Sequence, residues 1–187
     1  MGALPKPETF FTYADYKAWE LAEGERFELI YGEAFAMSVP GERHQLILGE
    51  LFSQFHAHLR GKPCKVFPAP YDVRLFFQED ESDDTVVQPD ITVVCDEKKR
   101  GSEGCRGAPD LVVEILSPSN TAVEMQRKLS LYQRSGVREY WVVDGESREL
   151  TVFHFGEPQL LFFKSNDTVP VAVLPGLTIS LQQFFEV

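Results

Sequence analysis

Residues 110–144, DLVVEILSPSNTAVEMQRKLSLYQRSGVREYWVVD, decide the fold that the sequence predicts. The first seven residues are β-branched and apolar, which is typical of a buried strand, and the turn-forming residues 117–120 (SPSN) end it. Thr121 and Glu124 have the spacing of a capping box, so a helix is expected to begin there and to end at Gly136. EYWVVD is then a second apolar strand. A strand, a helix and a strand in this order predict a right-handed crossover between parallel strands.

The predicted helix carries an apolar stripe. Met125, Leu129 and Tyr132 recur at positions i, i+4 and i+7. This spacing places the three side chains on one face of a helix, which is expected to lie against the core.

One charged residue, Glu114, stands in the middle of the first strand. A carboxylate in a buried strand costs free energy unless it is paired, hydrogen-bonded or bound to a metal. Two interpretations stay open from this strand alone. The strand is half exposed, with Asp110, Val112 and Glu114 on its wetter face, or Glu114 is a metal-binding or catalytic carboxylate.

Length and composition predict one globular domain over residues 1–187. The chain is 43% hydrophobic and 25% charged, as in ordinary soluble proteins, and no apolar stretch is long enough to span a bilayer. The cysteines, Cys64, Cys95 and Cys105, are odd in number and show no CxxC spacing. We therefore expect reduced thiols, neither a disulfide nor a zinc framework, and a cytoplasmic protein.

The segments around this crossover are also expected to form helices and strands, which makes the predicted class α/β with a mixed sheet. Before residue 110 we expect 12–21 (helix), 26–38 (hairpin), 42–60 (helix), and 66–77 and 86–94 (one strand each). After Asp144, three β-like runs precede a short helical turn at the C-terminus. Residues 1–11 contain two prolines and are expected to form an arm.

Two acidic residues come together if the strands 86–94 and 110–116 pair as an antiparallel hairpin. Asp90 stands near the start of the first strand and Glu114 toward the end of the second, so their carboxylates would meet at one end of the sheet. Asp110 lies four residues from Glu114, about 13 Å along the strand, and is excluded. Two such carboxylates can hold a divalent ion such as Mg²⁺, which takes one or two carboxylates together with phosphate and water.

Lys128 has two interpretations on these residues alone. It lies two turns into the helix, from where its ammonium could reach the sheet end and position a water or stabilise charge on a phosphoryl group. Alternatively it forms an i, i+4 ion pair with Glu124 on a solvated face, which the residues by themselves favour.

Several segments together resemble a large bacterial family of Uma-type restriction endonucleases with a PD-(D/E)XK nuclease core, most of whose members have no known function. They are YGEAFAM, QPDITVV, PDLVVEILSPS, RKLSLY and GVREYWVVD, and the resemblance covers nearly the whole chain. It implies a restriction-endonuclease-like core: a mixed sheet flanked by helices, with an N-terminal hairpin and extra C-terminal strands. It also implies a metal site at Asp90 and Glu114, with Lys128 as the basic residue and His44 beside them among the catalytic residues.

The sequence departs from the family pattern at two positions. The nuclease motif has its lysine two residues after the glutamate, where this chain has Leu116, so the lysine must have moved to the helix. The family usually has aspartate four residues before that lysine, where this chain has Glu124, and its role stays open between helix cap and site. The roles of Glu28 and Glu50 also stay open.

The charge distribution qualifies the nuclease interpretation. The net charge of −11 argues against a broad nucleic-acid-binding face. Residues 98–106 contain four basic side chains (Lys98, Lys99, Arg100, Arg106), but they lie at the sheet end opposite Asp90. The acidic loop 79–84 (EDESDD) enters the Asp90 strand at the catalytic end and would repel phosphates unless it folds away. We therefore expect a homodimer in which a second subunit supplies basic surface.

Two function classes follow from the residues and the resemblance. The first is a DNA endonuclease that uses Mg²⁺ or Mn²⁺ held by Asp90 and Glu114. The alternative is a non-catalytic module, a nuclease fold kept for protein interaction or regulation.

Overall fold

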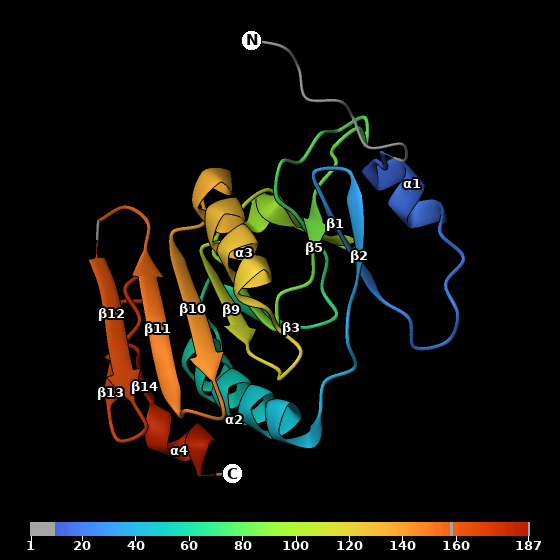
Figure 1. The fold of residues 1–187 in the computed structure, drawn as a ribbon. Coiled ribbons are helices and arrows are strands. Elements are labelled where there is room, and N and C mark those ends of the chain that lie inside the picture. The colour runs from blue at the N-terminus through green and yellow to red at the C-terminus, as the bar shows by residue number, and fades with distance from the viewer. Residues whose placement is uncertain (1–9, 158, 187) are drawn as a thin grey trace.

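The computed structural model describes residues 10–157 and 159–186 and contains the crossover expected from residues 110–144 (Figure 1). Strand β9 (Leu111–Ile115) and strand β10 (Glu139–Asp144) are parallel and are joined by helix α3 (Ala122–Ser135). Thr121 and Glu124 form the capping box, and Gly136 ends the helix with a φ of 93°. The predicted strand, capped helix and second parallel strand of this segment are therefore confirmed.

This crossover lies at the centre of a mixed six-stranded sheet. Its strand order is β12-β11-β10-β9-β6-β3, and only β9 and β10 are parallel. The remaining strands are β3 (Lys65–Pro68), β6 (Ile91–Val94), β11 (Glu149–His154) and β12 (Gln159–Lys164). The antiparallel pairing of β6 with β9, with Ile91 opposite Val113, confirms the predicted hairpin.

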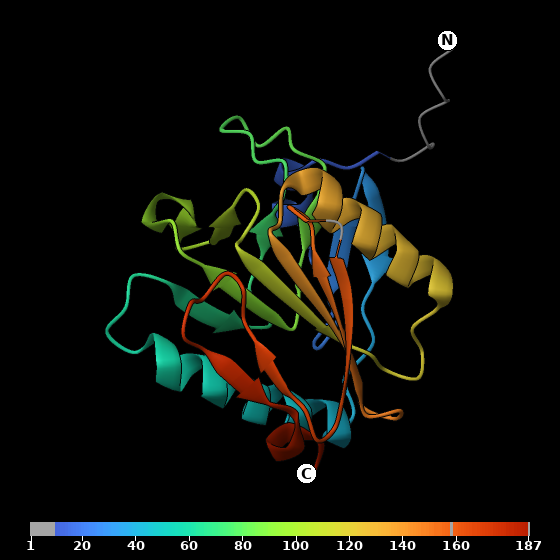
Figure 2. The same cartoon turned by 90° about the vertical axis from the view of Figure 1, so that its left-hand side faces the viewer.

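Helix α2 (Glu42–Leu59) covers one face of the central sheet, and α3 lies on the other (Figure 2). On the α2 side, Leu51 and Phe55 pack against Val113 and Trp141 in the larger core. The C-terminal elements complete this side, namely β13 (Thr168–Pro170), β14 (Thr178–Ser180) and α4 (Leu181–Phe185). The short helical turn expected at the C-terminus is thus confirmed.

A second six-stranded sheet and α3 pack on the face of the central sheet that α2 does not cover. Its strand order is β2-β1-β5-β4-β8-β7. The strands are β1 (Phe27–Ile30), β2 (Glu33–Ala36), β4 (Val73–Arg74), β5 (Val86–Val87), β7 (Arg100–Gly101) and β8 (Gly104–Arg106). Helix α1 (Tyr13–Ala18), capped by Thr12, and the 3₁₀ turn η1 (Glu97–Lys99) flank it. The β1–β2 hairpin turns at Tyr31 and Gly32, which both have positive φ, as this tight hairpin turn requires.

The two segments expected as single strands, 66–77 and 86–94, are each divided between the two sheets. The first forms β3 and β4, and the second forms β5 and β6. Prolines stand at the breaks, where they provide no backbone donor for a continuous ladder. As a result, Gln88-Pro89-Asp90 is the junction where the chain passes from one sheet to the other.

The expectation of reduced cysteines is wrong for two of the three. Cys64 and Cys95 form a disulfide. The pairing of Lys65 with Val94 in β3 and β6 places the next residues, 64 and 95, opposite each other, which spacing along the chain does not reveal. Cys105 is free and buried, and burial raises its thiol pKa to about 12.

The arm expected in residues 1–11 falls almost entirely outside the described residues. None of the helices in the described part combines the length and the apolar character needed to cross a bilayer.

Candidate functional site

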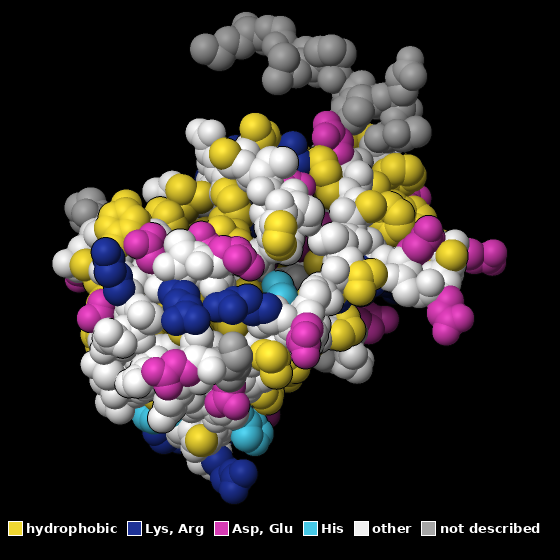
Figure 3. Space-filling view, turned by 60° about the horizontal axis from the view of Figure 1, so that its bottom comes forward, with side chains coloured by type: hydrophobic (Ala, Val, Ile, Leu, Met, Phe, Trp, Pro, Cys, Tyr) yellow, Lys and Arg dark blue, Asp and Glu magenta, His cyan; other side chains and the backbone are white. Residues whose placement is uncertain are grey.

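A cleft of about 260 Å³ lies between the β1–β2 hairpin and α3. The hairpin forms one wall, the 117–120 turn and the first turns of α3 form the other, and Asp90 and Glu114 belong to its lining. Figure 3 views the molecule from the end at which β9 and β10 finish, where basic side chains gather beside a histidine. The charged and histidine side chains that line the cleft are Arg26, Glu28, His44, Asp90, Glu114, Glu124, Arg127 and Lys128.

The structure brings Asp90 and Glu114 together. Because Ile91 pairs with Val113 at the end of the ladder, the next residues, Asp90 and Glu114, lie opposite each other just beyond it. Asp90 Oδ2 accepts a hydrogen bond from the backbone N–H of Ile115 at 2.7 Å. His44, near the start of α2, places its Nε2 at 3.2 Å from the same oxygen. The orientation of Asp90 is therefore fixed from two sides.

Lys128 bridges two buried carboxylates. Its Nζ donates to Glu114 Oε1 at 2.9 Å and to Glu28 Oε1 at 3.0 Å. Tyr132 on the same helix donates its hydroxyl to Glu114 Oε1 at 2.5 Å. The outward pairing of Lys128 with Glu124 is not what the structure shows, because Glu124 accepts from the backbone N–H of Thr121 in the capping box.

The strand that carries Glu114 is buried along its whole length, so the half-exposed interpretation is wrong. Val112 contributes to the core between the sheet and α3, and Asp110 pairs with Arg138 and accepts from the N–H of Cys95 at the other end. Of the predicted apolar stripe on α3, Tyr132 is fully buried, whereas Met125 and Leu129 are half-buried.

Burial sets the protonation of the site. Burial raises the pKa of Glu114, the charges of Glu28 and Asp90 raise it further, and Lys128 opposes them. Burial alone would lower the pKa of Lys128, but Glu114 and Glu28 outweigh it, so the ammonium is retained. Burial likewise opposes the charge of His44, yet its contact with Asp90 raises its pKa overall.

The donor set fits a divalent cation that takes only part of its coordination from protein. Glu28 and Glu114 share the single ammonium of Lys128, and Asp90 lies opposite Glu114, so three carboxylates line the cleft close to one lysine. In the described part of the chain no three acidic, histidine or cysteine side chains converge as a complete metal cage. Gln88 lines the cleft, and its buried Oε1 has no hydrogen-bond partner. Two carboxylates with further oxygen ligands from water and phosphate are the pattern that suits Mg²⁺.

Glu28 is the site residue that sequence reasoning left open. It is buried on β1, and besides Lys128 it accepts from the backbone N–H of Gln88 at 3.0 Å. A carboxylate within the apolar strand FELI is the same signal that singled out Glu114, and it was present in the sequence. Glu50, also left open, is exposed on α2 and does not line the cleft.

The acidic loop 79–84 folds away from the cleft. Asp83 is buried and pairs with Arg74, and Glu81 pairs with Lys17 of α1 at 2.6 Å. The basic residues of the 98–106 segment follow β6 at the end opposite Asp90, as expected. Neither group therefore sets the potential inside the cleft, which depends on the side chains that line it.

Comparisons with known proteins agree with the fold and identify the family. The sequence model of the family described as "Uma2: Putative restriction endonuclease" matches residues 13–182. A protein of Synechocystis sp. (strain ATCC 27184 / PCC 6803 / Kazusa), described as "Uncharacterized protein slr1290", is 26% identical over 175 residues, which are 91% of this chain and 89% of the relative. A crystal structure from Anabaena variabilis ATCC 29413, described as "a putative nuclease belonging to DUF820", aligns with a TM-score of 0.74 at 21% identity. The alignment covers 94% of this chain and 98% of that one, which shows the shared fold.

Proposed function

Because the chain belongs to the Uma2 family of restriction-endonuclease-like proteins, we propose that it hydrolyses phosphodiester bonds of DNA with a divalent metal ion. One observation carries the proposal. A buried lysine donates to Glu114 at 2.9 Å in the same cleft that brings Glu114 opposite Asp90. A lysine in contact with one acid, and a second acid opposite the first, are the functional set that the PD-(D/E)XK resemblance implies for Lys128, Glu114 and Asp90.

Each residue has a role that its contacts support. Asp90 and Glu114 would hold Mg²⁺ or Mn²⁺, which when bound lowers the pKa of water and stabilises charge on a phosphoryl group. Lys128, held by Glu28 and Glu114, keeps an ammonium beside the reacting phosphate and stabilises the charge that develops there. His44 holds Asp90 in place and is a positioning residue.

The test is cleavage of supercoiled DNA by the purified protein with Mg²⁺ or Mn²⁺. We expect nicking by the wild type, loss of nicking in Asp90→Asn and in Glu114→Gln, and unchanged nicking in Glu50→Gln, whose carboxylate is exposed on α2. Activity that survives removal of both cleft carboxylates would indicate a contaminating nuclease. A wild type that cuts no DNA with either ion would favour the non-catalytic module.

A homodimer stays a prediction of the charge argument. Light scattering of the purified protein measures it directly. A monomer would mean that one copy must supply every basic group that meets DNA.

A further inference from the structure

Two arginines face the cleft beside the acidic set without a carboxylate partner. Arg26 and Arg127 both line it, and both are half-buried. Throughout residues 10–157 and 159–186, neither guanidinium forms an ion pair, whereas Lys128 is paired twice. A backbone hydrogen bond in the capping box lowers the pKa of Glu124, and the charge of Arg127, one helical turn away, lowers it further, but these two side chains form no direct pair. A cation in a cleft that forms no direct ion pair is suited to an anion from solution.

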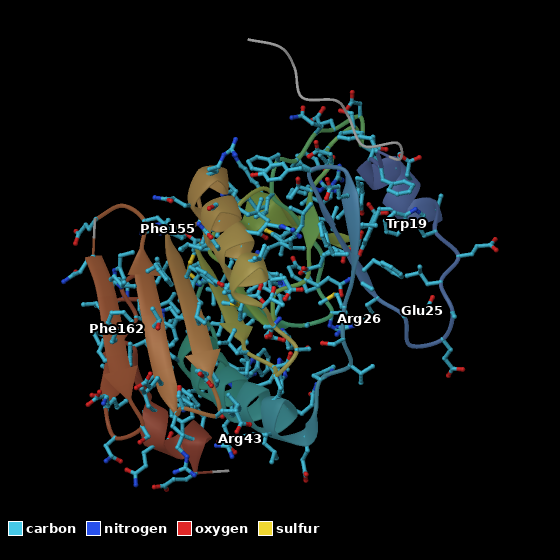
Figure 4. All side chains as sticks on the ribbon, viewed as in Figure 1. Trp19, Glu25, Arg26, Arg43, Phe155 and Phe162 are labelled. Atoms are coloured by element: carbon cyan, nitrogen blue, oxygen red, sulfur yellow. A yellow bond between two sulfur atoms is a disulfide. The ribbon has the colours of Figure 1, made fainter. Side chains whose placement is uncertain are left out.

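The hairpin explains why Arg26 faces the cleft. Glu28 pairs with Phe35 across the β1–β2 ladder, and Arg26 stands two residues before Glu28. Residues two apart on a strand share a face, so Arg26 lies about 7 Å from Glu28 on that same face. The carbonyl of Arg26 also accepts from the N–H of Met37, which closes the base of the hairpin. Figure 4 shows Arg26 at the foot of the hairpin.

Arg127 comes from the opposite wall and is held by an aromatic ring. It precedes Lys128 on α3, and its guanidinium lies 4.2 Å from the centre of the Phe35 ring. Stacking on a ring occupies one face of the guanidinium and leaves the in-plane N–H donors free. Those donors form the planar fork that recognises phosphate oxygens in pairs.

The carboxylates of the cleft would repel a polyanion such as DNA unless cations such as Arg26 and Arg127 lie beside them. The lining contains four carboxylates, Glu28, Asp90, Glu114 and Glu124, and the whole chain has a net charge of −11. The net charge of the chain therefore gives no general attraction for DNA, and the 98–106 cations lie at the other sheet end. Any phosphate that approaches Asp90 and Glu114 must be stabilised by cations within the cleft itself.

We propose that Arg26 and Arg127 form a clamp, one from each wall, that binds the phosphate backbone of a DNA strand and presents it to Asp90 and Glu114. The inference rests on the proposed nuclease function. It adds the binding residues for the substrate, which lie outside the acid and lysine set.

Binding of a fluorescent DNA oligonucleotide tests the clamp without cleavage. Asp90→Asn serves as the common background, because it removes a proposed metal ligand with little change in shape. In this background, Arg26→Gln and Arg127→Gln are each expected to weaken binding by about tenfold, as loss of a charged hydrogen bond does. Each should also reduce the slope of log affinity against log salt by about 0.7 for a single strand or 0.9 for a duplex.

Arg60→Gln is the matched control. Arg60 is exposed at the C-terminal end of α2, about 24 Å along the helix from His44, and its loss removes the same charge. It should leave affinity and salt slope unchanged. Arg127→Lys checks folding and geometry together, because it should keep the salt slope while losing part of the affinity.

Four results would overturn the clamp. They are unchanged affinity in Arg127→Gln, an equal loss in Arg60→Gln, tighter binding of RNA of the same sequence through the same arginines, and no binding of DNA by the background protein. The nuclease proposal is judged separately by cleavage. If Arg26→Gln and Arg127→Gln weaken DNA binding but the wild type never cuts DNA, the clamp stands and the nuclease proposal is wrong. If the wild type cuts DNA but neither substitution weakens binding, only the clamp is wrong.

Discussion

Lys128 is held between two acids that would repel each other without it. The side chains of Glu28, Glu114 and Lys128 are 7%, 12% and 17% exposed, so water screens their charges little. Removing one partner of a buried ion pair lowers stability strongly, because the remaining charge is left uncompensated. Replacing both partners by apolar side chains changes stability much less. The lysine that is proposed for chemistry is therefore also a structural counter-ion.

Lys128→Met is expected to lower the free energy of unfolding by about 3–5 kcal/mol at pH 7, because two buried carboxylates lose their cation. Urea unfolding measures it. A second substitution, Glu28→Gln, should restore part of the loss by removing one of the two charges. Lys17→Met is the control, since Lys17 is 37% exposed in its pair with Glu81 and such solvent-screened pairs add little to stability. A loss in Lys128→Met as small as in the control would contradict this account of the buried network.

Glu139 is a second buried acid, at the start of β10 and away from the cleft. Its Oε1 accepts from Trp141 Nε1 at 2.7 Å, its Oε2 accepts from the N–H of Val173 at 2.9 Å, and His154 Nε2 lies 4.0 Å from Oε1. Burial raises its pKa, although these hydrogen bonds act in the opposite direction. The folded protein thus keeps this proton at pH values where the unfolded chain has released it.

The raised pKa of Glu139 predicts that its contribution to stability falls as pH rises. A carboxyl group with a raised pKa in the folded state lowers stability once the pH exceeds the pKa of the unfolded chain, near 4.5, because the unfolded chain then releases the proton more readily. Glu139→Gln cannot titrate, so the stability advantage of the wild type over this variant should shrink between pH 5 and pH 8. Urea unfolding of both proteins at the two pH values gives the difference. An advantage that is constant or grows with pH would show that Glu139 is not held protonated.

Helix α3 is the element on which the site depends, because it carries Arg127, Lys128 and Tyr132. Its ends are fixed locally, by the Thr121–Glu124 capping box and by Gly136. Two of its side chains are proposed to act on a phosphate, so the geometry of the site follows the docking of this helix. Changes at its ends should therefore act on stability first.

Two glycines, one directly after α3 and one within α2, are expected to respond to alanine in opposite directions. Gly136 has a φ of 93°, which costs an alanine about 1–2 kcal/mol, so Gly136→Ala should lower the melting temperature. Gly49 lies within α2, and an added Cβ would meet no atom within 4 Å. Gly49→Ala should therefore raise stability by about 0.5–1 kcal/mol. Calorimetry of both variants measures their melting temperatures. Shifts of the same sign in the two variants would contradict the assignment of Gly136 as the end of α3.

At the level of elements, local signals predicted the crossover, the hairpin and both long helices. The caps at Thr121 and Gly136 and the period of apolar residues are local properties, and they determine where these elements begin and end. The division of 66–77 and 86–94 between two sheets was not predictable in the same way. An apolar run indicates that a strand is buried, but not which sheet it joins.

The candidate site shows the same limit. Asp90 and Glu114 were placed together because the pairing of two neighbouring strands follows from the sequence. The residues alone favoured an outward direction for Lys128, because Glu28, which attracts it inward, lies 100 positions away. The inward direction was predicted only from the family resemblance, and the contact with Glu114 confirms it. The disulfide was missed for a related reason, since Cys64 and Cys95 meet only when β3 pairs with β6.

In the whole molecule, the disulfide closes the sheet end opposite the cleft. Its partners are separated by 31 residues, and removal of a bond that closes such a loop costs about 3–4 kcal/mol. Cys64→Ser/Cys95→Ser should lose this stability in urea while its DNA cleavage at low temperature is unchanged. Cys95 lies five residues from Asp90, at the other end of β6. Cleavage that falls in parallel with stability under folded conditions would show that the two sheet ends are coupled.

The whole fold brings residues from two sheets and a helix into one cleft. Glu28 comes from the second sheet and Glu114 from the central sheet. Asp90 comes from the junction between the two sheets, and Lys128 comes from α3. Asp90 and Glu114 in this set are proposed to bind one divalent cation, and calorimetric titration of the protein with Mn²⁺ measures this binding. We expect one ion per chain in the wild type and in Glu50→Gln, and affinity weakened by about tenfold or more in Asp90→Asn and in Glu114→Gln. Equal binding of Mn²⁺ by wild type and Asp90→Asn/Glu114→Gln, or no binding by the wild type, would contradict this proposal.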